Sequence, residues 1–465
     1  MTKKTDLELN KYFQPLTESG FTYEKKGDCI AIRYNKAIAK QPMFKDVMDQ
    51  IYEVLDHLEM QMTIGLENFP YCAVNNNARD HIITNRSERQ GIKAKKCRSC
   101  FYFRLCTGFP RGYWRRHGQS EIQPIADAPS EVMIEITPQC NLNCRFCFNA
   151  SSFARHDRNA QNKLTTAFVK KIIRHIKKEG IKIVRFTGGE PLLRKDIFEL
   201  LSYAKKRGLE VRLNTNGLLI DKAAAHRLAK IADNILIPIE SWNDKEEDRI
   251  TGGQKCLTKK IQTIKLLAAN RIPVVRAGTV AIKNNIKNFD RLAKIVLKLP
   301  IREWEFYRPA YSSQNKDILK KADLENLAEK IYQTQKKTDI RITIGNGVPF
   351  CAIKDANKMN AVCAGALYDE GRRRLVIDPR GYVKPDYTID MNIGRPTDIL
   401  GAWKNPFVKK IRETAGLPEA CFHCHFRQKC CGGSRLWAKI TSSDWQAPDP
   451  LMAKNRLTSA PINKI

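Results

Sequence analysis

The sequence predicts an α/β protein with a parallel sheet or barrel in its central part. Short apolar strands alternate with amphipathic helices from Val132 to Tyr307, and this alternation is typical of parallel α/β folds. The helix expected at Lys163–Lys178 shows the pattern clearly, because its apolar side chains recur at helical spacing on one stripe. Six strand–helix units are expected, and the last helix follows Tyr307. The expected strands are 132–137, 181–187, 210–214, 234–239, 273–281 and 303–307, and the other expected helices are 196–206, 222–231, 258–269 and 289–297.

Length and composition limit the classes of protein to consider. The 465 residues favour two to four domains of roughly 100–200 residues each. No stretch approaches the roughly 18 continuous apolar residues that a membrane helix needs. The N-terminus also lacks the apolar segment of a secretory signal. We therefore expect a soluble, cytoplasmic protein without a membrane partner.

The chain carries a formal net charge of +32. A field of this size favours anionic partners such as nucleic acid or an acidic peptide. The basic residues, however, are spread along helix faces, and the chain has no recognisable nucleic-acid-binding module. A solvated basic surface is therefore the default interpretation, and a nucleic-acid partner is not favoured.

Fifteen cysteines, many of them in CxxC-type groups, predict metal sites. The most informative group is EITPQCNLNCRFCFN, which places Cys140, Cys144 and Cys147 in a CxxxCxxC pattern. Three thiolates at this spacing can ligate three irons of a 4Fe–4S cluster and leave the fourth iron open to a small molecule. A zinc site or buried thiols are the alternatives.

Further motifs follow the next expected strands. RFTGGEPLL places Gly188, Gly189 and Glu190 after the second strand, NTNG ends the third at residues 214–217, and Glu240 ends the fourth. The cysteine loop follows the first strand. Loops at the carboxyl ends of parallel strands converge in space. The sequence therefore predicts one shared site at that edge of the sheet.

The cysteine triad, GGE and TNG, in this order and spacing, resemble the radical S-adenosylmethionine (radical SAM) family over roughly residues 132–309. The resemblance implies a partial (β/α)6 TIM-like barrel that binds SAM at the open iron of the cluster. It also implies that an electron from the cluster cleaves SAM to methionine and a 5′-deoxyadenosyl radical, which abstracts a hydrogen atom from the substrate. The protein would bind and orient these cofactors.

The same resemblance implies SAM-binding roles for the matching residues. Gly188 and Gly189 would allow close backbone approach, because they lack a Cβ. Glu190 would accept hydrogen bonds from the SAM ammonium group. The remaining expected SAM-binding residues are Phe146, near the adenine, Asn216 and Glu240.

A second cysteine group lies towards the C-terminus in CFHCHFRQKCCGGSR. It contains Cys421, Cys424 and Cys430 at CxxCxxxxxC spacing. Together with the upstream Cys363 and IDPRGYVKPD, this order resembles the SPASM domain, an extension that carries auxiliary iron–sulfur clusters. The resemblance implies an auxiliary cluster on these cysteines, with a structural zinc as the alternative.

The chain departs from the SPASM pattern in ways that limit the number of clusters. Asp386 and Ser434 stand where the pattern has cysteines, and no cysteine follows Cys431. The ligands of a two-cluster domain are therefore not all present, and we expect one auxiliary cluster here. Its fourth ligand is expected to be Cys363, and the alternatives are Cys351, Cys431 and Asp386.

A third cysteine group near the N-terminus repeats the CxxCxxxxxC spacing in KKCRSCFYFRLCTG. Its expected ligands are Cys97, Cys100 and Cys106, with Cys72 of NFPYC as the fourth. The likeness to the second group is explained by an old duplication or by one loop geometry that suits a cluster. A further iron–sulfur cluster is expected, and the alternatives are zinc or cysteines that are free or disulfide-linked.

The predicted organisation has four parts. They are an N-terminal extension with a metal or iron–sulfur site at 1–125, a radical SAM partial barrel at 126–338, a SPASM-like cluster domain at 339–447 and a tail at 448–465. We expect the enzyme to modify a peptide or protein side chain, with a flavodoxin or ferredoxin as electron donor. The main alternative is a small-molecule substrate, a haem or other tetrapyrrole precursor. RNA modification and a non-catalytic electron carrier are the remaining alternatives.

Overall fold

The computed structural model of the chain describes most of the sequence. The described residues are 13–18, 21–26, 29–34, 42–58, 63–67, 69–74, 78, 82–83, 91–100, 102–103, 106–125, 127–147, 162–310, 318–412, 416–422, 424 and 426–452. The chain divides into two compact units, Met1–Asp127 and Ala128–Ile465. The four-part organisation expected from the sequence remains a prediction.

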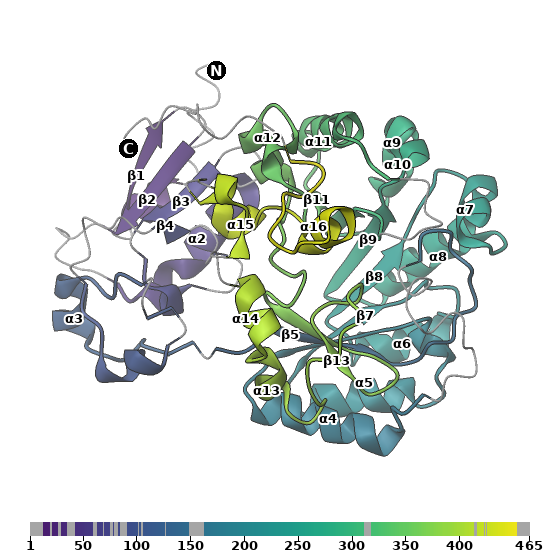
Figure 1. Ribbon diagram of the computed structural model, residues 1–465, viewed down its shortest axis with the longest axis horizontal. Helices are drawn as coiled ribbons and strands as arrows, with labels where there is room; N and C mark the ends of the chain where they lie inside the picture. The colour runs from purple at the N-terminus through teal and green to yellow at the C-terminus, as the bar shows by residue number, and fades with distance from the viewer. Residues whose placement is uncertain are drawn as a thin grey trace. The chain divides into compact units, whose positions relative to one another are not determined.

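The N-terminal unit contains a four-stranded sheet in the order β1-β2-β3-β4 (Figure 1). β1 (Phe21–Lys26) and β2 (Cys29–Tyr34) form an antiparallel pair. β3 (Thr63–Glu67) and β4 (Ile82–Ile83) continue the sheet in parallel. The segment that carries Cys72 follows β3 directly in the chain.

A cluster of aromatic side chains lies in the core of this unit, among more numerous aliphatic ones. Phe44, the first residue of helix α2 (Phe44–Leu58), packs against Phe69 and Tyr113, with ring centroids 5.6 and 4.9 Å apart. Tyr113 lies in helix α3 (Arg111–His117), which follows the third cysteine of the CxxCxxxxxC group. Each large buried ring contributes a large apolar area to such a small core. Because Phe69 precedes Cys72 and Tyr113 follows Cys106, this core anchors both ends of the segment that carries the N-terminal cysteines.

The second unit is built on a nine-stranded sheet in the order β11-β10-β9-β8-β7-β6-β5-β12-β13 (Figure 1). All neighbouring strands are parallel except β12 and β13. The strands from β5 to β11 lie in chain order with helices between them, which confirms the predicted parallel α/β fold. The strands are β5 (Glu131–Glu135), β6 (Ile183–Thr187), β7 (Glu210–Asn214), β8 (Asn234–Pro238), β9 (Val274–Val280), β10 (Glu303–Tyr307), β11 (Arg341–Ile344), β12 (Arg374–Ile377) and β13 (Val383–Lys384).

Helix α4 (Thr166–Lys178) illustrates how the connecting helices form. Thr165 caps it, because its hydroxyl oxygen accepts a hydrogen bond of 3.3 Å from the backbone N–H of Phe168. Its apolar stripe is buried, as the sequence pattern predicts. The other connecting helices are α5 (Ile197–Lys206), α6 (Lys222–Ala229), α7 (Asp244–Thr251), α8 (Cys256–Ala269), α9 (Lys283–Lys287), α10 (Phe289–Val296) and α11 (Lys321–Gln335).

A buried charge network ties β12 to the first strands of this sheet. Arg185 on β6 donates to both carboxylate oxygens of Glu131 on β5, at 2.8 and 2.9 Å. Arg212 and Arg374 approach the same carboxylate at 3.2 and 3.5 Å. Burial alone would raise the pKa of Glu131, but the three guanidinium groups hold it well below its usual range. The C-terminal part of the chain is thereby joined to the parallel sheet.

The sequence-based prediction did not anticipate β11, β12 and β13 as members of this sheet. The remaining C-terminal elements are the short 3-10 helices η7 (Phe350–Ala352) and η9 (Glu419–Cys421) and the helices α12 (Ala356–Val362), α13 (Ile399–Trp403), α14 (Pro406–Arg412), α15 (Arg427–Cys430) and α16 (Arg435–Ser442). In the parts of the chain that the structure describes, no helix is both long and apolar enough to cross a membrane.

Candidate active site

The loops that follow β5, β6 and β7 meet at one edge of the sheet. The backbone N–H of Gly189, after β6, donates to the carbonyl of Thr137, after β5, at 2.7 Å. The next N–H, that of Glu190, donates to the carbonyl of Gln139 at the same distance of 2.7 Å. The Asn216 side chain, after β7, donates to the side-chain oxygen of Asn141 at 2.7 Å. The cysteine loop, GGE and TNG are therefore one hydrogen-bonded assembly.

The two glycines of GGE are required by this close approach. A Cβ added to Gly188 would lie 2.5 Å from the Thr137 carbonyl oxygen, and its φ of 137° also disfavours any side chain. A Cβ on Gly189 would overlap the backbone of Gln139, whose carbonyl carbon would be 2.5 Å away. Both glycines thus let the second loop pack directly against the residues that precede Cys140.

Glu190 is fully buried and binds the TNG turn. Its carboxylate accepts hydrogen bonds from the Thr215 hydroxyl at 2.6 Å, the Asn216 N–H at 2.7 Å and the Leu192 N–H at 3.0 Å. Burial raises the pKa of Glu190, and these three donors oppose the rise. The carboxylate therefore fixes the second and third loops to each other.

The cysteine loop itself is held by the end of helix α7. The N–H groups of Asn143 and Arg145 donate to the carbonyls of Thr251 and Ile250, at 2.8 and 3.0 Å. Asn143 and Arg145 flank Cys144, so these two hydrogen bonds fix its backbone. Within the loop, the Leu142 N–H donates to the Cys140 sulfur at 3.4 Å. The structure places Cys140 at the surface, and it places Cys144, Phe146 and Cys147 half-buried.

A buried lysine beside Cys144 was missed by the sequence-based prediction. Lys260 on α8 forms an ion pair of 2.6 Å with Glu247 on α7, and both side chains are almost completely buried. Burial raises the pKa of the Cys144 thiol to about 12; Lys260 opposes this rise, and Cys147, Glu240 and Cys140 add to it. In the sequence, Lys260 falls on the apolar stripe of its helix, between Leu257 and Ile264. A charged residue at such a position is the sequence feature that could have identified it as buried.

Glu240, at the end of β8, lies next to this ion pair. Its N–H donates to Glu247 at 2.9 Å, and its carboxylate accepts a hydrogen bond of 2.8 Å from the Val280 N–H. Burial and, to a smaller extent, the neighbouring Glu247 together raise the pKa of Glu240 to about 8, against the opposing effect of Lys260. Glu240 is therefore mainly uncharged at neutral pH, which matters for any contact with a charged ligand.

The residues of this edge fit a thiolate-ligated cluster. Three soft sulfur donors suit iron–sulfur chemistry, and they influence one another's ionisation. Over the described residues, no group of three or more His, Cys, Asp or Glu side chains is already gathered around a point that could hold a metal ion.

The C-terminal cysteines lie close to one another and to Cys351. Burial raises the pKa of the Cys421 thiol to about 11; Arg435 opposes the rise, and Cys424, Cys351 and Cys431 add to it. Burial likewise raises the pKa of Cys430, and Cys431 and Cys351 again contribute.

Cys363, the expected fourth ligand, has different neighbours. Burial raises the pKa of its thiol to about 11, and its charged neighbours are Lys429 and Asp369. Its sulfur accepts a hydrogen bond of 3.3 Å from the Gly365 N–H. Its assignment as a ligand remains a prediction.

Asp386 and Ser434, which replace SPASM cysteines, have local structural roles. Asp386 accepts hydrogen bonds from the Thr388 N–H and hydroxyl at 2.9 and 2.7 Å and from the Glu370 N–H at 3.1 Å. Ser434 caps α16 by accepting from the Trp437 N–H at 3.3 Å, and its hydroxyl donates to Glu370 at 2.7 Å.

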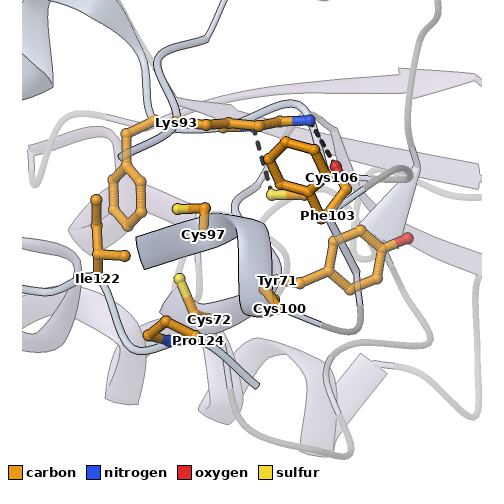
Figure 2. Close-up of a pocket in the computed structure, with 11 residues that line it drawn as sticks. Tyr71, Cys72, Lys93, Cys97, Cys100, Phe103, Cys106, Ile122 and Pro124 are labelled. Carbon is orange, nitrogen blue, oxygen red and sulfur yellow. Dashed lines mark hydrogen bonds between the residues drawn. The ribbon is translucent and has the colours of Figure 1, made fainter. Parts of the chain in front are cut away.

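The third predicted group also comes together. Cys72, Cys97, Cys100 and Cys106 all line one cavity of the N-terminal unit (Figure 2). Burial raises the pKa of Cys72 to about 11; a backbone hydrogen bond from Gln123 opposes the rise, and the thiols of the other three cysteines add to it.

Known proteins with similar sequences agree with these features. Residues 134–296 match the family model of the Radical SAM superfamily. A PqqA peptide cyclase from Bradyrhizobium diazoefficiens is 26% identical over 347 residues, which cover 71% of this chain and 87% of that relative. An AdoMet-dependent heme synthase from Methanosarcina barkeri is 25% identical over 345 residues, which cover 70% of this chain and 97% of that relative.

Solved structures show the same fold. The crystal structure of Streptococcus suis SuiB bound to its precursor peptide SuiA aligns with a TM-score of 0.54 and 20% identity, over 75% of this chain and 78% of SuiB. The described chain is thus a partial TIM barrel with its site at the carboxyl ends of the strands. The protein contains a radical SAM domain, which the family model matches over residues 134–296. More particularly, it is an iron–sulfur enzyme that uses a 4Fe–4S cluster and SAM.

Proposed function

We propose that the protein uses radical chemistry initiated from SAM to modify a side chain of a peptide or protein. The observation that carries the reaction class is the direct hydrogen bonding of the cysteine loop to GGE and TNG at one sheet edge. Support for the substrate class comes from the similarity to a PqqA peptide cyclase and to SuiB, which was crystallised with a precursor peptide.

The site residues have distinct expected roles in this reaction. When bound, the cluster and SAM would supply the 5′-deoxyadenosyl radical that removes a hydrogen atom from the substrate. Cys140, Cys144 and Cys147 would hold the cluster. Gly188 and Gly189 would bring the backbone of GGE beside the cysteine loop. Their close contacts with residues 137–139 support this role.

Glu190 would act on SAM mainly by positioning the loops around it. A carboxylate has about four acceptor positions, and three are occupied by protein donors. About one position is therefore left for the ammonium group of SAM. The remaining proposed SAM contacts are Phe146, Asn216 and Glu240.

The C-terminal cysteines would hold one auxiliary cluster. Cys421, Cys424 and Cys430 would supply three ligands; support comes from the proximity of Cys421 to Cys424 and of both Cys421 and Cys430 to Cys351. Asp386 and Ser434 stand at two SPASM cysteine positions but offer no thiolate, and each makes hydrogen bonds to neighbouring residues instead. This favours one cluster over two in the C-terminal part of the chain. A flavodoxin or ferredoxin would supply the electron.

The reaction class is tested by anaerobic reconstitution with iron and sulfide, followed by reduction in the presence of SAM. We expect 5′-deoxyadenosine from the wild-type protein and none above background from the Cys140→Ala/Cys144→Ala/Cys147→Ala variant. The triad variant is the matched control, because it leaves the other cysteine groups intact.

The substrate class is tested by adding short peptides encoded beside the gene to the same reaction. We expect one of them to stimulate 5′-deoxyadenosine formation and to lose hydrogen or gain a cross-link, as seen by mass spectrometry. A second candidate substrate, a tetrapyrrole precursor, is favoured by the heme synthase that aligns over 97% of its own length. Conversion of the tetrapyrrole with no change in any peptide would replace the peptide proposal.

A further inference from the structure

A cavity in the N-terminal unit is surrounded by four cysteines. Cys72, Cys97, Cys100 and Cys106 line a space of about 20 Å³, together with Tyr71, Phe103, Phe109, Ile122 and Pro124 (Figure 2). The cavity lies outside residues 134–296, which match the radical SAM family model. The SAM chemistry of the barrel therefore does not account for these cysteines.

The turn that carries Cys72 has a counterpart in the C-terminal part of the chain. Residues 69–74 read FPYCAV and residues 348–353 read VPFCAI. Both form a 3-10 helix, η1 (Tyr71–Ala73) and η7 (Phe350–Ala352), preceded by a proline in extended conformation. The prolines have nearly the same backbone angles, φ −66° and ψ 131° against φ −71° and ψ 130°. Cys72 and Cys351 occupy the same position in the two turns.

The two CxxCxxxxxC loops also share their backbone hydrogen bonds. The Cys100 N–H donates to the Cys97 carbonyl at 2.9 Å, and the Cys424 N–H donates to the Cys421 carbonyl at 3.1 Å. The third cysteines match as well. The Cys106 N–H donates four residues back to Tyr102 at 2.7 Å, and the Cys430 N–H donates four residues back to Phe426 at 2.8 Å.

The turn and the loop are joined in the same way in both places. The Phe350 N–H donates to the Cys430 sulfur at 3.4 Å, and the backbone of Tyr71 forms the equivalent hydrogen bond to Cys106. The aromatic residues of turn and loop also contact each other. Tyr71 packs on Tyr102 with ring centroids 4.2 Å apart, and Phe350 packs on Phe426 at 5.6 Å. Sequence spacing alone would not require any of these shared contacts.

We propose that the chain contains two copies of one iron–sulfur motif, each made of a Pro-aromatic-Cys turn and a CxxCxxxxxC loop, and that both copies bind a 4Fe–4S cluster through four cysteines. The ligands of the N-terminal copy are Cys72, Cys97, Cys100 and Cys106. The ligands of the C-terminal copy are Cys351, Cys421, Cys424 and Cys430. Cys351 thus takes the place of Cys363 as the fourth ligand, and Cys431 matches the non-ligand Thr107.

A 4Fe–4S cluster and a zinc ion both take four thiolate ligands, so the metal count described below decides between them. The sulfurs also receive backbone hydrogen bonds, from the Gly108 N–H to Cys106 at 3.3 Å and from the Ile125 N–H to Cys100 at 3.4 Å. Such N–H···S contacts are typical of cluster ligands and tune the cluster's potential. Four cysteine ligands leave no open iron, so neither cluster would bind substrate directly.

The proposal is tested by counting metal and sulfide in the full-length protein after anaerobic reconstitution. We expect about 12 iron and 12 sulfide per chain, because each of the three clusters contributes about four of each. The Cys97→Ala/Cys100→Ala variant should lose about four iron atoms, and so should the Cys421→Ala/Cys424→Ala variant. Each should keep its SAM cluster, identified by the change in the electron paramagnetic resonance signal on addition of SAM.

A matched pair of single variants tests the fourth ligand of the C-terminal copy. Cys351→Ala should lose about four iron atoms or yield an altered cluster signal, whereas Cys363→Ala should retain the wild-type count. The opposite result would overturn the assignment of Cys351. These readouts do not depend on 5′-deoxyadenosine, so the proposed function can fail independently.

Two results would overturn the N-terminal cluster: zinc in place of four iron atoms, or an unchanged iron count in Cys97→Ala/Cys100→Ala. A wild-type count of about eight would overturn the proposal that both copies bind a cluster. If the double variant does not fold, as judged by circular dichroism, the wild-type count decides alone. About 12 iron atoms with no zinc then supports the proposal, and about eight contradicts it.

Discussion

Replacing Lys260 by methionine would break the buried ion pair beside the cysteine loop. The side chains of Lys260 and Glu247 are 1% and 0% exposed, and their charged atoms lie 2.6 Å apart. Methionine leaves the Glu247 carboxylate buried without its counter-charge. Removing one partner of such a pair costs about 3–5 kcal/mol of the free energy of unfolding. The loss should be largely recovered in Lys260→Met/Glu247→Gln, because glutamine is uncharged and still accepts the hydrogen bond from the Glu240 N–H.

Urea unfolding, followed by circular dichroism under anaerobic conditions, measures this cost. The control is Arg249→Met on α7, the helix that carries Glu247, because Arg249 pairs with Glu246 at 2.8 Å with side chains 48% and 24% exposed. An exposed pair of this kind contributes about 0–1 kcal/mol. The reasoning would be refuted if Lys260→Met cost no more than Arg249→Met, or if the double variant were no more stable than Lys260→Met.

The remaining predictions concern the loops and the ionisation of the barrel. Glu190→Gln should lower the free energy of unfolding by about 2–4 kcal/mol and reduce 5′-deoxyadenosine formation, because an amide cannot accept all three hydrogen bonds; unchanged stability would contradict this. Gly189→Ala should abolish cluster incorporation at the triad, measured as iron content, since its Cβ would overlap a neighbouring backbone. Gly180→Ala is the control: its φ of 78° strains a side chain, but its Cβ meets no atom within 4 Å, and it should keep wild-type iron content. Burial raises the pKa of Glu135 to about 7, although Lys384 opposes the rise. Above pH about 4.5 the unfolded protein loses the proton of this carboxyl group, whereas the folded protein keeps it up to pH about 7. The free energy of unfolding should therefore fall by roughly 3 kcal/mol between pH 4.5 and pH 7. Glu135→Gln should flatten this fall in urea titrations; an unchanged pH profile would contradict it.

The fold could be predicted where it depends on local pattern. The expected helix 163–178 corresponds to α4 (Thr166–Lys178), which starts later because Thr165 is its cap. β12 could not be predicted in the same way. It pairs with β5 through contacts such as Arg374 with Glu131, which are far apart in sequence. The buried charge network around Glu131 stabilises the pairing of β12 with β5. A periodic pattern in the local sequence does not reveal such a network.

The site could be predicted as a meeting of motifs but not as a set of contacts. Strand order explains why the cysteine loop, GGE and TNG share an edge. It does not reveal that Glu190 binds the TNG turn, because the sequence does not specify which donors surround a buried carboxylate. Lys260 was overlooked because a charged residue on an apolar stripe usually marks the edge of the stripe, not its buried centre. The likeness of FPYCAV to VPFCAI was visible in the sequence, but the resemblance to the SPASM pattern favoured Cys363 over Cys351.

The most direct test of the central claim is 5′-deoxyadenosine formation by the reduced, fully reconstituted protein in the presence of SAM. We predict that the wild-type protein forms it and that the triple variant at Cys140, Cys144 and Cys147 does not. Equal amounts from both proteins, or none from a wild-type protein with its full complement of iron, would contradict the assignment of this edge of the barrel as a SAM-cleaving site.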